Sequence, residues 1–247
     1  MKPQAEVKFF DAFAEAHGDY DVLGEGAYKR LLSRFERLCE PRPREHCLDC
    51  GCGTGAFTRR LIKFDLDLIG IDISPRSIQS AQAQATLERY LVGDISQLDM
   101  PDSSIDIVVL SGVLHHFPQP EFRKTILREA FRVLKTGGRV FAFDPSAHSP
   151  SMWLYRDPSS PLYSQAGKTE NEVLLTRNQL TTEVRQAGFE RISVRGVGGM
   201  TFRYVEGRVA RTFLPLYNLY ERLLRISPLE NWLGTFLISF GKKPPCP

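Results

Sequence analysis

The residues best suited to chemistry form one short run, in which an acid precedes three alternating glycines. Asp49 stands two residues before Gly51, and Gly53 and Gly55 follow at alternate positions. Glycine has no Cβ atom, so the backbone of such a turn can lie against a ligand, and the helix behind it offers unpaired N–H groups. A carboxylate at Asp49 would repel a pyrophosphate but suits a cationic ammonium group or a ribose diol. The run therefore predicts a site for a nucleotide-type ligand.

A second acid stands at the spacing typical of a ribose-binding residue. Asp72 lies 21 residues after Gly51, close to the distance at which an acid after the second strand takes both ribose hydroxyls. Ser74 and Pro75 also look like a helix cap followed by a first-turn proline, so a helix N-terminal residue is the alternative interpretation of Asp72. We expect Asp72 to bind a ribose.

Two further acids are predicted at strand ends. Asp94, together with Ile95, could hydrogen-bond the exocyclic amino group of an adenine and cover its face, and an ordinary loop acid is the alternative. Asp144 ends a later predicted strand. Ligands of open α/β sheets bind outside the carboxyl ends of the strands, so all these acids are expected at one edge of the sheet.

The elements that must position these acids alternate between strand and helix patterns after a helical start. Apolar residues at helical spacing predict helices over Glu6–His17 and Glu25–Cys39. Strands are predicted at Cys47–Cys50, Leu68–Ile71, Arg89–Val92, Ile105–Leu110, Arg139–Phe143, Arg191–Val194 and Phe236–Phe240. Further helices are predicted at Gly55–Phe64, Pro75–Thr86, Pro120–Leu134 and Asn178–Ala187. This alternation predicts an α/β fold with a mostly parallel sheet and helices on both faces.

Composition and charge are those of an ordinary globular protein. The chain has 247 residues, of which 42% are hydrophobic and 25% charged, and its net charge of +3 gives no support for nucleic-acid binding. Met1–Asp11 has no apolar signal-peptide core, and no long uninterrupted apolar run occurs, so we expect a cytoplasmic protein. The five cysteines suit packed, reduced thiols, because Cys47 and Cys50 would point to opposite faces of a strand and could not share a metal ion.

Five motifs stand in register between about residues 45 and 145. They are Leu48–Gly55, Gly70–Ser74, Gly93–Ile95, Ile105–Val108 through His115–Phe117, and Arg132–Arg139. As a set they resemble the motifs of class I S-adenosylmethionine-dependent methyltransferases. The resemblance implies a Rossmann-like, seven-stranded sheet with an antiparallel last strand, and S-adenosyl-L-methionine as cofactor. It implies cofactor contacts from Asp49, Gly51, Gly53, Gly55, Asp72, Ile73, Asp94, Ile95 and Ser111.

The same resemblance suggests a division of the chain and leaves two other functions open. We expect a helical cap over residues 1–44, then a methyltransferase domain over 45–247 with substrate-covering insertions at about 145–177 and 196–234. A protein that binds the cofactor without turnover is one alternative. An NAD(P)-dependent oxidoreductase is the other, because Gly51, Gly53 and Ala56 satisfy the Gly/Ala form of the dinucleotide fingerprint. The acid at position 49 is unusual for that class.

Two histidines after the fourth predicted strand are the candidate catalytic residues. Methyl transfer depends mainly on alignment, but an alcohol or phenol acceptor profits from proton removal, and histidine titrates near working pH. We therefore consider His115 and His116 as general bases, with His115 slightly favoured. A helix-entry turn whose rings bond to the backbone is the alternative. No ring of carboxylates accompanies them in the sequence, so no metal is expected.

The acceptor must be selected outside the cofactor half. Residues 110–113 read Leu-Ser-Gly-Val, where enzymes that methylate nucleobase amino groups commonly carry Asp/Asn-Pro-Pro-aromatic, so that reaction is not expected. Residues 195–225 carry six arginines against two glutamates, interleaved with apolar residues. This basic segment suits a membrane surface, a lipid-linked substrate or an acidic partner, and a lid helix with a solvated basic face is the slightly favoured alternative.

These observations predict a methyltransferase that uses S-adenosylmethionine. Its acceptor is expected to be a small molecule or a lipid- or glycan-linked group, and an oxygen acceptor is slightly favoured over nitrogen or carbon.

Overall fold

The computed structural model describes residues 21–160, 171–203 and 207–245, together with residues 8, 11, 12, 163, 169 and 205. Most of the helix predicted over Glu6–His17 therefore lies outside the described residues. The helix predicted over Glu25–Cys39 is present with the same bounds, as α2.

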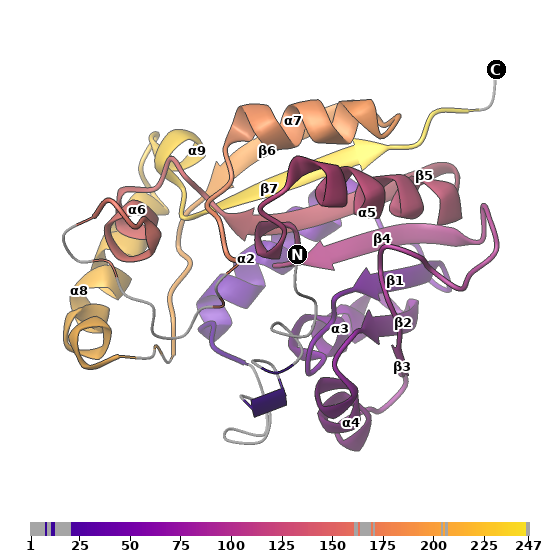
Figure 1. Cartoon of the computed structure of the whole chain (residues 1–247), viewed down its shortest axis with the longest axis horizontal. Helices are drawn as coiled ribbons and strands as arrows, with labels where there is room; N and C mark the ends of the chain where they lie inside the picture. The colour runs from indigo at the N-terminus through magenta and orange to yellow at the C-terminus, as the bar shows by residue number, and fades with distance from the viewer. Residues whose placement is uncertain are drawn as a thin grey trace.

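Seven strands form one sheet in the order β3-β2-β1-β4-β5-β7-β6 (Figure 1). They are β1 His46–Cys50, β2 Asp67–Asp72, β3 Arg89–Val92, β4 Ile105–Ser111, β5 Leu134–Pro145, β6 Glu190–Val197 and β7 Phe236–Lys242. The first five strands pair in parallel, whereas β7 lies antiparallel between β5 and β6. The predicted class, the seven strands and the antiparallel last strand are confirmed. The strand order reverses between β1 and β4, which is where open α/β sheets bind ligands.

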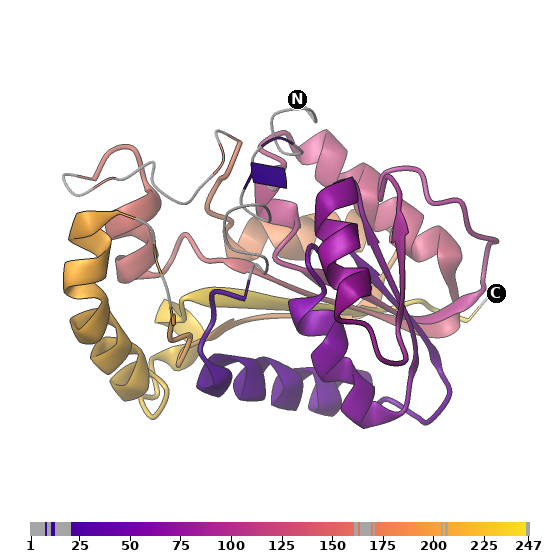
Figure 2. The same ribbon diagram turned by 90° about the horizontal axis from the view of Figure 1, so that it is seen from below.

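Helices cover both faces of the sheet, as the edge-on view in Figure 2 shows. Besides α2 they are α3 Ala56–Leu61, α4 Pro75–Ala83, α5 Pro120–Val133, α6 Pro150–Arg156, α7 Arg177–Gln186, α8 Arg208–Leu224 and α9 Glu230–Leu233, with 3₁₀ turns η1 Ile62–Phe64 and η2 Leu114–His116. The start of α4 shows why local sequence sets these bounds. Ser74 Oγ accepts a hydrogen bond from the Ser77 N–H at 3.0 Å, and Pro75 occupies the first helical position, where its missing N–H has no cost.

The sheet separates two apolar cores. The core under α2 and α3 contains Cys47, and the core under α5 and α7 contains Cys50, so the two thiols do point to opposite faces as predicted. Burial raises the pKa of both thiols above their usual value, and they remain neutral packing groups.

The basic segment 195–225 does not form one continuous helix. Its first residues complete β6, because they pair with β7, and the helical part is α8. A bilayer-spanning helix would need a longer apolar run than any helix in the described part of the chain provides.

Candidate active site

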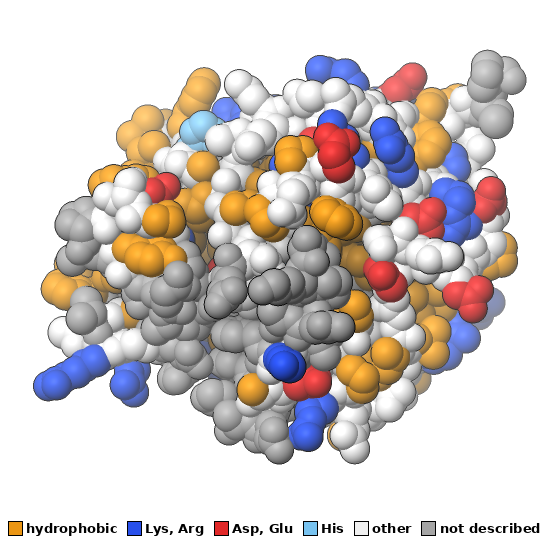
Figure 3. All heavy atoms as spheres, in the orientation of Figure 1, with side chains coloured by type: hydrophobic (Ala, Val, Ile, Leu, Met, Phe, Trp, Pro, Cys, Tyr) orange, Lys and Arg blue, Asp and Glu red, His pale blue; other side chains and the backbone are white. Residues whose placement is uncertain are grey.

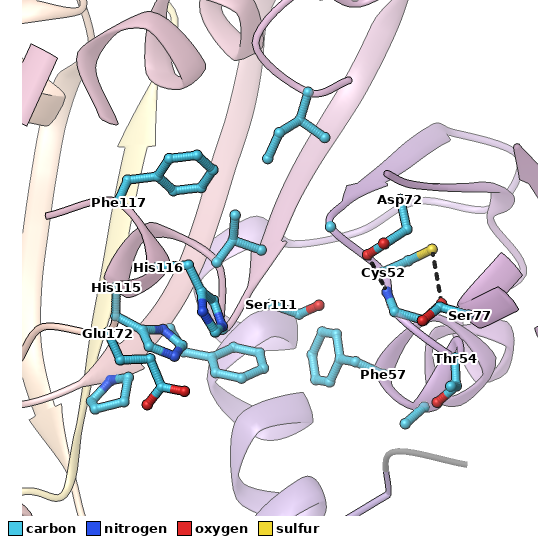
Figure 4. Close-up of a pocket in the computed structure, with 18 of the residues that line it drawn as sticks. Cys52, Thr54, Phe57, Asp72, Ser77, Ser111, His115, His116, Phe117 and Glu172 are labelled. Atoms are coloured by element: carbon cyan, nitrogen blue, oxygen red, sulfur yellow. Dashed lines mark hydrogen bonds between the residues drawn. The ribbon is translucent and has the colours of Figure 1, made fainter. Parts of the chain in front are cut away.

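A cavity of about 350 Å³ lies at the carboxyl ends of the strands. Figure 4 shows its two ends: Asp72 lies on one side with the loop after β1, and His115 and Glu172 lie on the other. Ser111 and Phe57 lie between them. Residues predicted to bind a cofactor and residues predicted to act in catalysis therefore line one continuous space.

The glycine loop after β1 forms part of the cavity wall. Gly51 and Gly53 line it with φ of +75° and +54°, a left-handed backbone that favours glycine. A Cβ atom on Gly51 would lie 2.5 Å from Val113, whereas a Cβ on Gly53 would meet no atom of the described residues within 4 Å apart from its chain neighbours. Gly55 does not line the cavity; its Cβ would collide with the ring of Tyr90, so this glycine serves packing behind the loop. Two of the three predicted glycines thus present backbone to the cavity.

Asp72 is held rigidly at the edge of the cavity. Its Oδ2 accepts the Gly53 N–H at 2.8 Å and its Oδ1 accepts the Ser74 N–H at 2.9 Å. Burial raises the pKa of this carboxyl, and the two backbone donors oppose that effect by favouring the charged form. Each oxygen keeps a lone pair for a further donor, as a ribose diol would require. Ile73 lines the cavity beside it.

Asp94 and Ile95 line the same cavity as Asp72. Asp94 Oδ1 accepts both the N–H and the hydroxyl of Ser96, at 2.8 and 2.7 Å, which orients the carboxylate. Ile95 is buried and offers an apolar surface. The pair therefore combines an acceptor and an apolar wall, the combination expected for an adenine.

Asp49 lies behind the cavity and does not line it. Its carboxylate is fully buried and accepts hydrogen bonds from Thr58 Oγ1 at 2.7 Å and from Ser111 Oγ at 3.0 Å. Burial raises the pKa of Asp49 to about 6. Ser111 does line the cavity, so Asp49 lies one hydrogen bond behind the cavity wall and fixes the orientation of the Ser111 hydroxyl.

His115 forms a buried pair with Asp144 at the opposite end. Asp144 Oδ1 accepts hydrogen bonds from the His115 backbone N–H and from His115 Nδ1, both at 3.0 Å. Because a carboxylate only accepts, Nδ1 carries the proton and Nε2 keeps a free lone pair. Burial lowers the pKa of His115, an effect that neighbouring His116 strengthens and Asp144 opposes. Within the described residues Asp144 Oδ2 has no hydrogen-bond partner.

His116 and Glu172 complete this end of the cavity. The His115 and His116 rings lie 4.1 Å apart, and ligand atoms of both histidines and of Glu172 lie within 4.8 Å of one another. Among the described residues, one carboxylate, that of Glu172, therefore lies beside both histidines, which is fewer than the ring of carboxylates that the sequence was expected to lack. Glu172 Oε2 accepts a hydrogen bond from Arg156 Nη1 at 2.8 Å, and Oε1 accepts the Thr169 N–H at 3.0 Å. The guanidinium beside this carboxylate opposes a second cation there.

Sequence reasoning missed three of these residues for different reasons. Asp144 carried a signal, its place at a strand end, but nothing in its spacing pointed to His115. Arg156 lies on α6, a helix that the sequence did not predict, and Glu172 lies in a loop without regular structure. No sequence motif marks the apolar wall of the cavity, because its residues are dispersed along the chain: Leu23, Tyr28, Phe57, Phe143, Met152, Phe202 and Phe236.

Comparisons with known proteins identify the family. A family described as a methyltransferase domain matches residues 48–142. The 27-O-demethylrifamycin SV methyltransferase of Amycolatopsis mediterranei is 32% identical, covering 98% of this chain and 93% of that protein. A malonyl-[acyl-carrier protein] O-methyltransferase of Serratia marcescens is 27% identical over 76% of each chain. A solved SAM-dependent methyltransferase from Archaeoglobus fulgidus has the same fold, with a TM-score of 0.63 at 17% identity over 95% of this chain and 100% of the other.

The chain belongs to the class I S-adenosylmethionine-dependent methyltransferases, as its motifs predicted. Its cofactor is S-adenosylmethionine, and the site suits that molecule. Asp72 has lone pairs left for a diol, Asp94 and Ile95 suit an adenine, and the open backbone at Gly53 leaves room for a close ligand. The oxidoreductase alternative is thereby set aside.

Proposed function

We propose that the enzyme methylates a hydroxyl oxygen of a largely apolar small molecule, with His115 as general base. The observation that carries this proposal is the buried His115–Asp144 pair, which leaves Nε2 as a proton acceptor at the end of the cavity away from Asp72. A hydroxyl is the acceptor that gains most from such a base, because it must lose a proton as its oxygen is methylated.

Each group of the chain has a defined task in this reaction. Bound S-adenosylmethionine supplies an electrophilic methyl group. The cofactor would be held by Asp72, Asp94 and the backbone at Gly53. Ser111, whose hydroxyl donates a hydrogen bond to Asp49, would also contact the cofactor. His115 Nε2 takes the proton of the acceptor hydroxyl, and Asp144 holds the Nδ1 proton and stabilises the imidazolium that forms.

The lining of the acceptor end supports an apolar substrate. Aromatic and aliphatic side chains supply most of the cavity wall there, and residues 22, 23 and 28 come from the segment predicted to act as a cap. One relative is named as an O-methyltransferase of malonyl-[acyl-carrier protein]. Another is named as a methyltransferase of 27-O-demethylrifamycin SV, and that substrate name implies a free hydroxyl.

A carboxylate acceptor is less well supported. Arg156 is the cationic side chain that could pair with it, but Glu172 already accepts a hydrogen bond from this guanidinium. A substrate carboxylate would have to compete with that ion pair.

Transfer of a labelled methyl group tests the proposal. The protein is incubated with methyl-labelled S-adenosylmethionine and, in parallel, with 27-O-demethylrifamycin SV, malonyl-acyl-carrier protein and a simple aliphatic amine. We expect label on the hydroxyl compound, with transfer lost in His115→Ala. Label only on the carboxylate or the amine, or equal transfer by His115→Ala, would refute the assignment of acceptor and base.

A further inference from the structure

The outer face of α8 exposes a row of large aliphatic side chains. Leu216, Leu219 and Leu223 are 62%, 51% and 58% exposed, and Ile226, just beyond the helix, is 75% exposed. Their spacing of three and four residues places them on one face. The opposite face packs against the molecule, where Leu224 is buried. We call these four exposed residues the α8 apolar face.

Unneutralised positive charge borders this face. Arg208, Arg211, Arg222 and Arg225 are exposed, and none of them has an ion-pair partner among the residues that the structure describes. At 100° per residue, Arg211, Arg222 and Arg225 lie along one side of the aliphatic row. The acid of α8 cannot offset them, because Glu221 is fully buried and bonded to Thr235 and to the Met200 N–H.

Exposed tryptophans stand on the two helices that flank α8. Trp153 of α6 is 42% exposed and Trp232 of α9 is 65% exposed. Figures 1 and 2 both place α6 beside α8, and Figure 3 shows hydrophobic side chains along this edge of the molecule with Lys or Arg side chains at its lower corner. Indole rings are favoured at the boundary between water and lipid, because they combine an apolar body with one N–H donor.

We propose that the α8 apolar face docks the enzyme on an anionic lipid bilayer. An aliphatic row with an arginine border and flanking tryptophans is the composition of an interfacial amphipathic helix, which buries its apolar face at the headgroup boundary while its cations meet lipid phosphates. A second copy of this chain suits the surface less well. A twofold interface places the same patch on both subunits, and thus brings the arginines of α8 together without exposed acids from that helix.

Docking here would bring the acceptor end of the cavity close to the lipid. Phe202 lines the cavity, its ring lies 5.6 Å from the ring of Tyr217 on α8, and its backbone exchanges two hydrogen bonds with Asn218. Phe202, a residue of the cavity wall, is thus hydrogen-bonded directly to α8. An apolar acceptor dissolved in the membrane would have a short route into the site, whatever its identity.

Co-sedimentation of the full chain with vesicles tests the docking surface. One vesicle preparation contains phosphatidylcholine alone, and the other contains phosphatidylcholine with phosphatidylglycerol. We expect binding to the anionic vesicles that weakens with added salt, and little binding to the neutral ones. Arg222→Gln/Arg225→Gln should weaken anionic binding on the order of tenfold or more, since each cation near the surface contributes about fivefold. Leu219→Glu/Leu223→Glu should abolish it.

Matched variants elsewhere separate the face from general effects. Arg128→Gln/Arg185→Gln removes the same charge from exposed positions on α5 and α7, and Leu87→Glu changes a leucine that is 81% exposed near β3. Both should bind vesicles like the wild type, and all variants should keep wild-type circular dichroism and affinity for S-adenosylhomocysteine. The proposal is overturned if the wild type does not bind anionic vesicles, or if the α8 variants bind them as well as the wild type does. It is also overturned if light scattering shows that the wild type is a dimer and that the α8 variants are monomers.

Discussion

The two ends of the cavity are built in opposite ways. At the cofactor end, Asp72 and Asp94 follow neighbouring strands, and each carboxylate accepts a backbone N–H from two residues further on; Asp72 also accepts the N–H of Gly53 in the glycine loop. At the acceptor end, His115, Asp144 and Glu172 come from three separate segments, and contacts between distant residues hold them. Neighbours in the chain therefore orient much of the proposed donor site, whereas the assembled fold brings together the proposed acceptor site. The following substitutions test whether the ends are as separable as this difference implies.

The largest expected effect is at the cofactor end. Asp72→Ala removes the acceptor of two charge-assisted hydrogen bonds from the ribose, of about 1.5–3 kcal/mol each, so affinity for S-adenosylhomocysteine should fall about 10²- to 10⁴-fold in calorimetry. Asp102→Ala, at an exposed position, serves as control and should leave the affinity unchanged. If Asp72→Ala bound S-adenosylhomocysteine with wild-type affinity, the proposal that Asp72 binds the ribose would be wrong.

His115→Ala should affect only the acceptor end. Loss of a general base lowers kcat by about 10²- to 10⁴-fold, while cofactor affinity measured on the same sample stays within about twofold of wild type. His46→Ala is the matched control, because His46 is half-exposed at the start of β1, at the far end of the sheet from the cavity. A parallel loss of cofactor affinity in His115→Ala would show that the two ends are one unit.

Asp144→Asn should produce a smaller loss and a change in pH dependence. The base must be neutral, and burial lowers the pKa of His115, so kcat/KM of the wild type should rise with pH along a limb centred below 6.5. Removing the carboxylate charge destabilises the imidazolium. The limb should then move to still lower pH, and kcat should fall by about 10- to 100-fold. A limb that moves to higher pH, or does not move, would contradict the pairing.

The smallest effect is expected at Glu172. Its pair with Arg156 is partly exposed and contributes about 0–1 kcal/mol, so Glu172→Gln should change kcat by no more than about fivefold. Activity should also survive dialysis against a chelator. Loss of activity in both tests, with recovery on adding a divalent cation, would make His115, His116 and Glu172 a metal site instead.

What the sequence could predict follows the same division. Strand ends, alternating glycines and the Ser74–Pro75 helix start depend on neighbours in the chain. The seven strands, and the acids at the ends of the strands on the cofactor side, could therefore be predicted from the sequence. The hydrogen-bond partner of His115 could not be predicted, because Asp144 lies 29 residues away in the chain and only the pairing of β4 with β5 brings the two residues together. The sequence predicted that Asp49 meets the cofactor directly or through water, and only the structure reveals that its carboxylate is fully buried and bonded to Ser111.

In our proposal, the acceptor end methylates a hydroxyl, and His115 is the base. A crystal structure with S-adenosylhomocysteine and a bound acceptor would give the distance from His115 Nε2 to the accepting atom. We predict a hydroxyl oxygen at about 2.6–3.2 Å. A nitrogen or carbon acceptor at that position, or a hydroxyl bonded to Glu172 and out of reach of His115, would contradict the account.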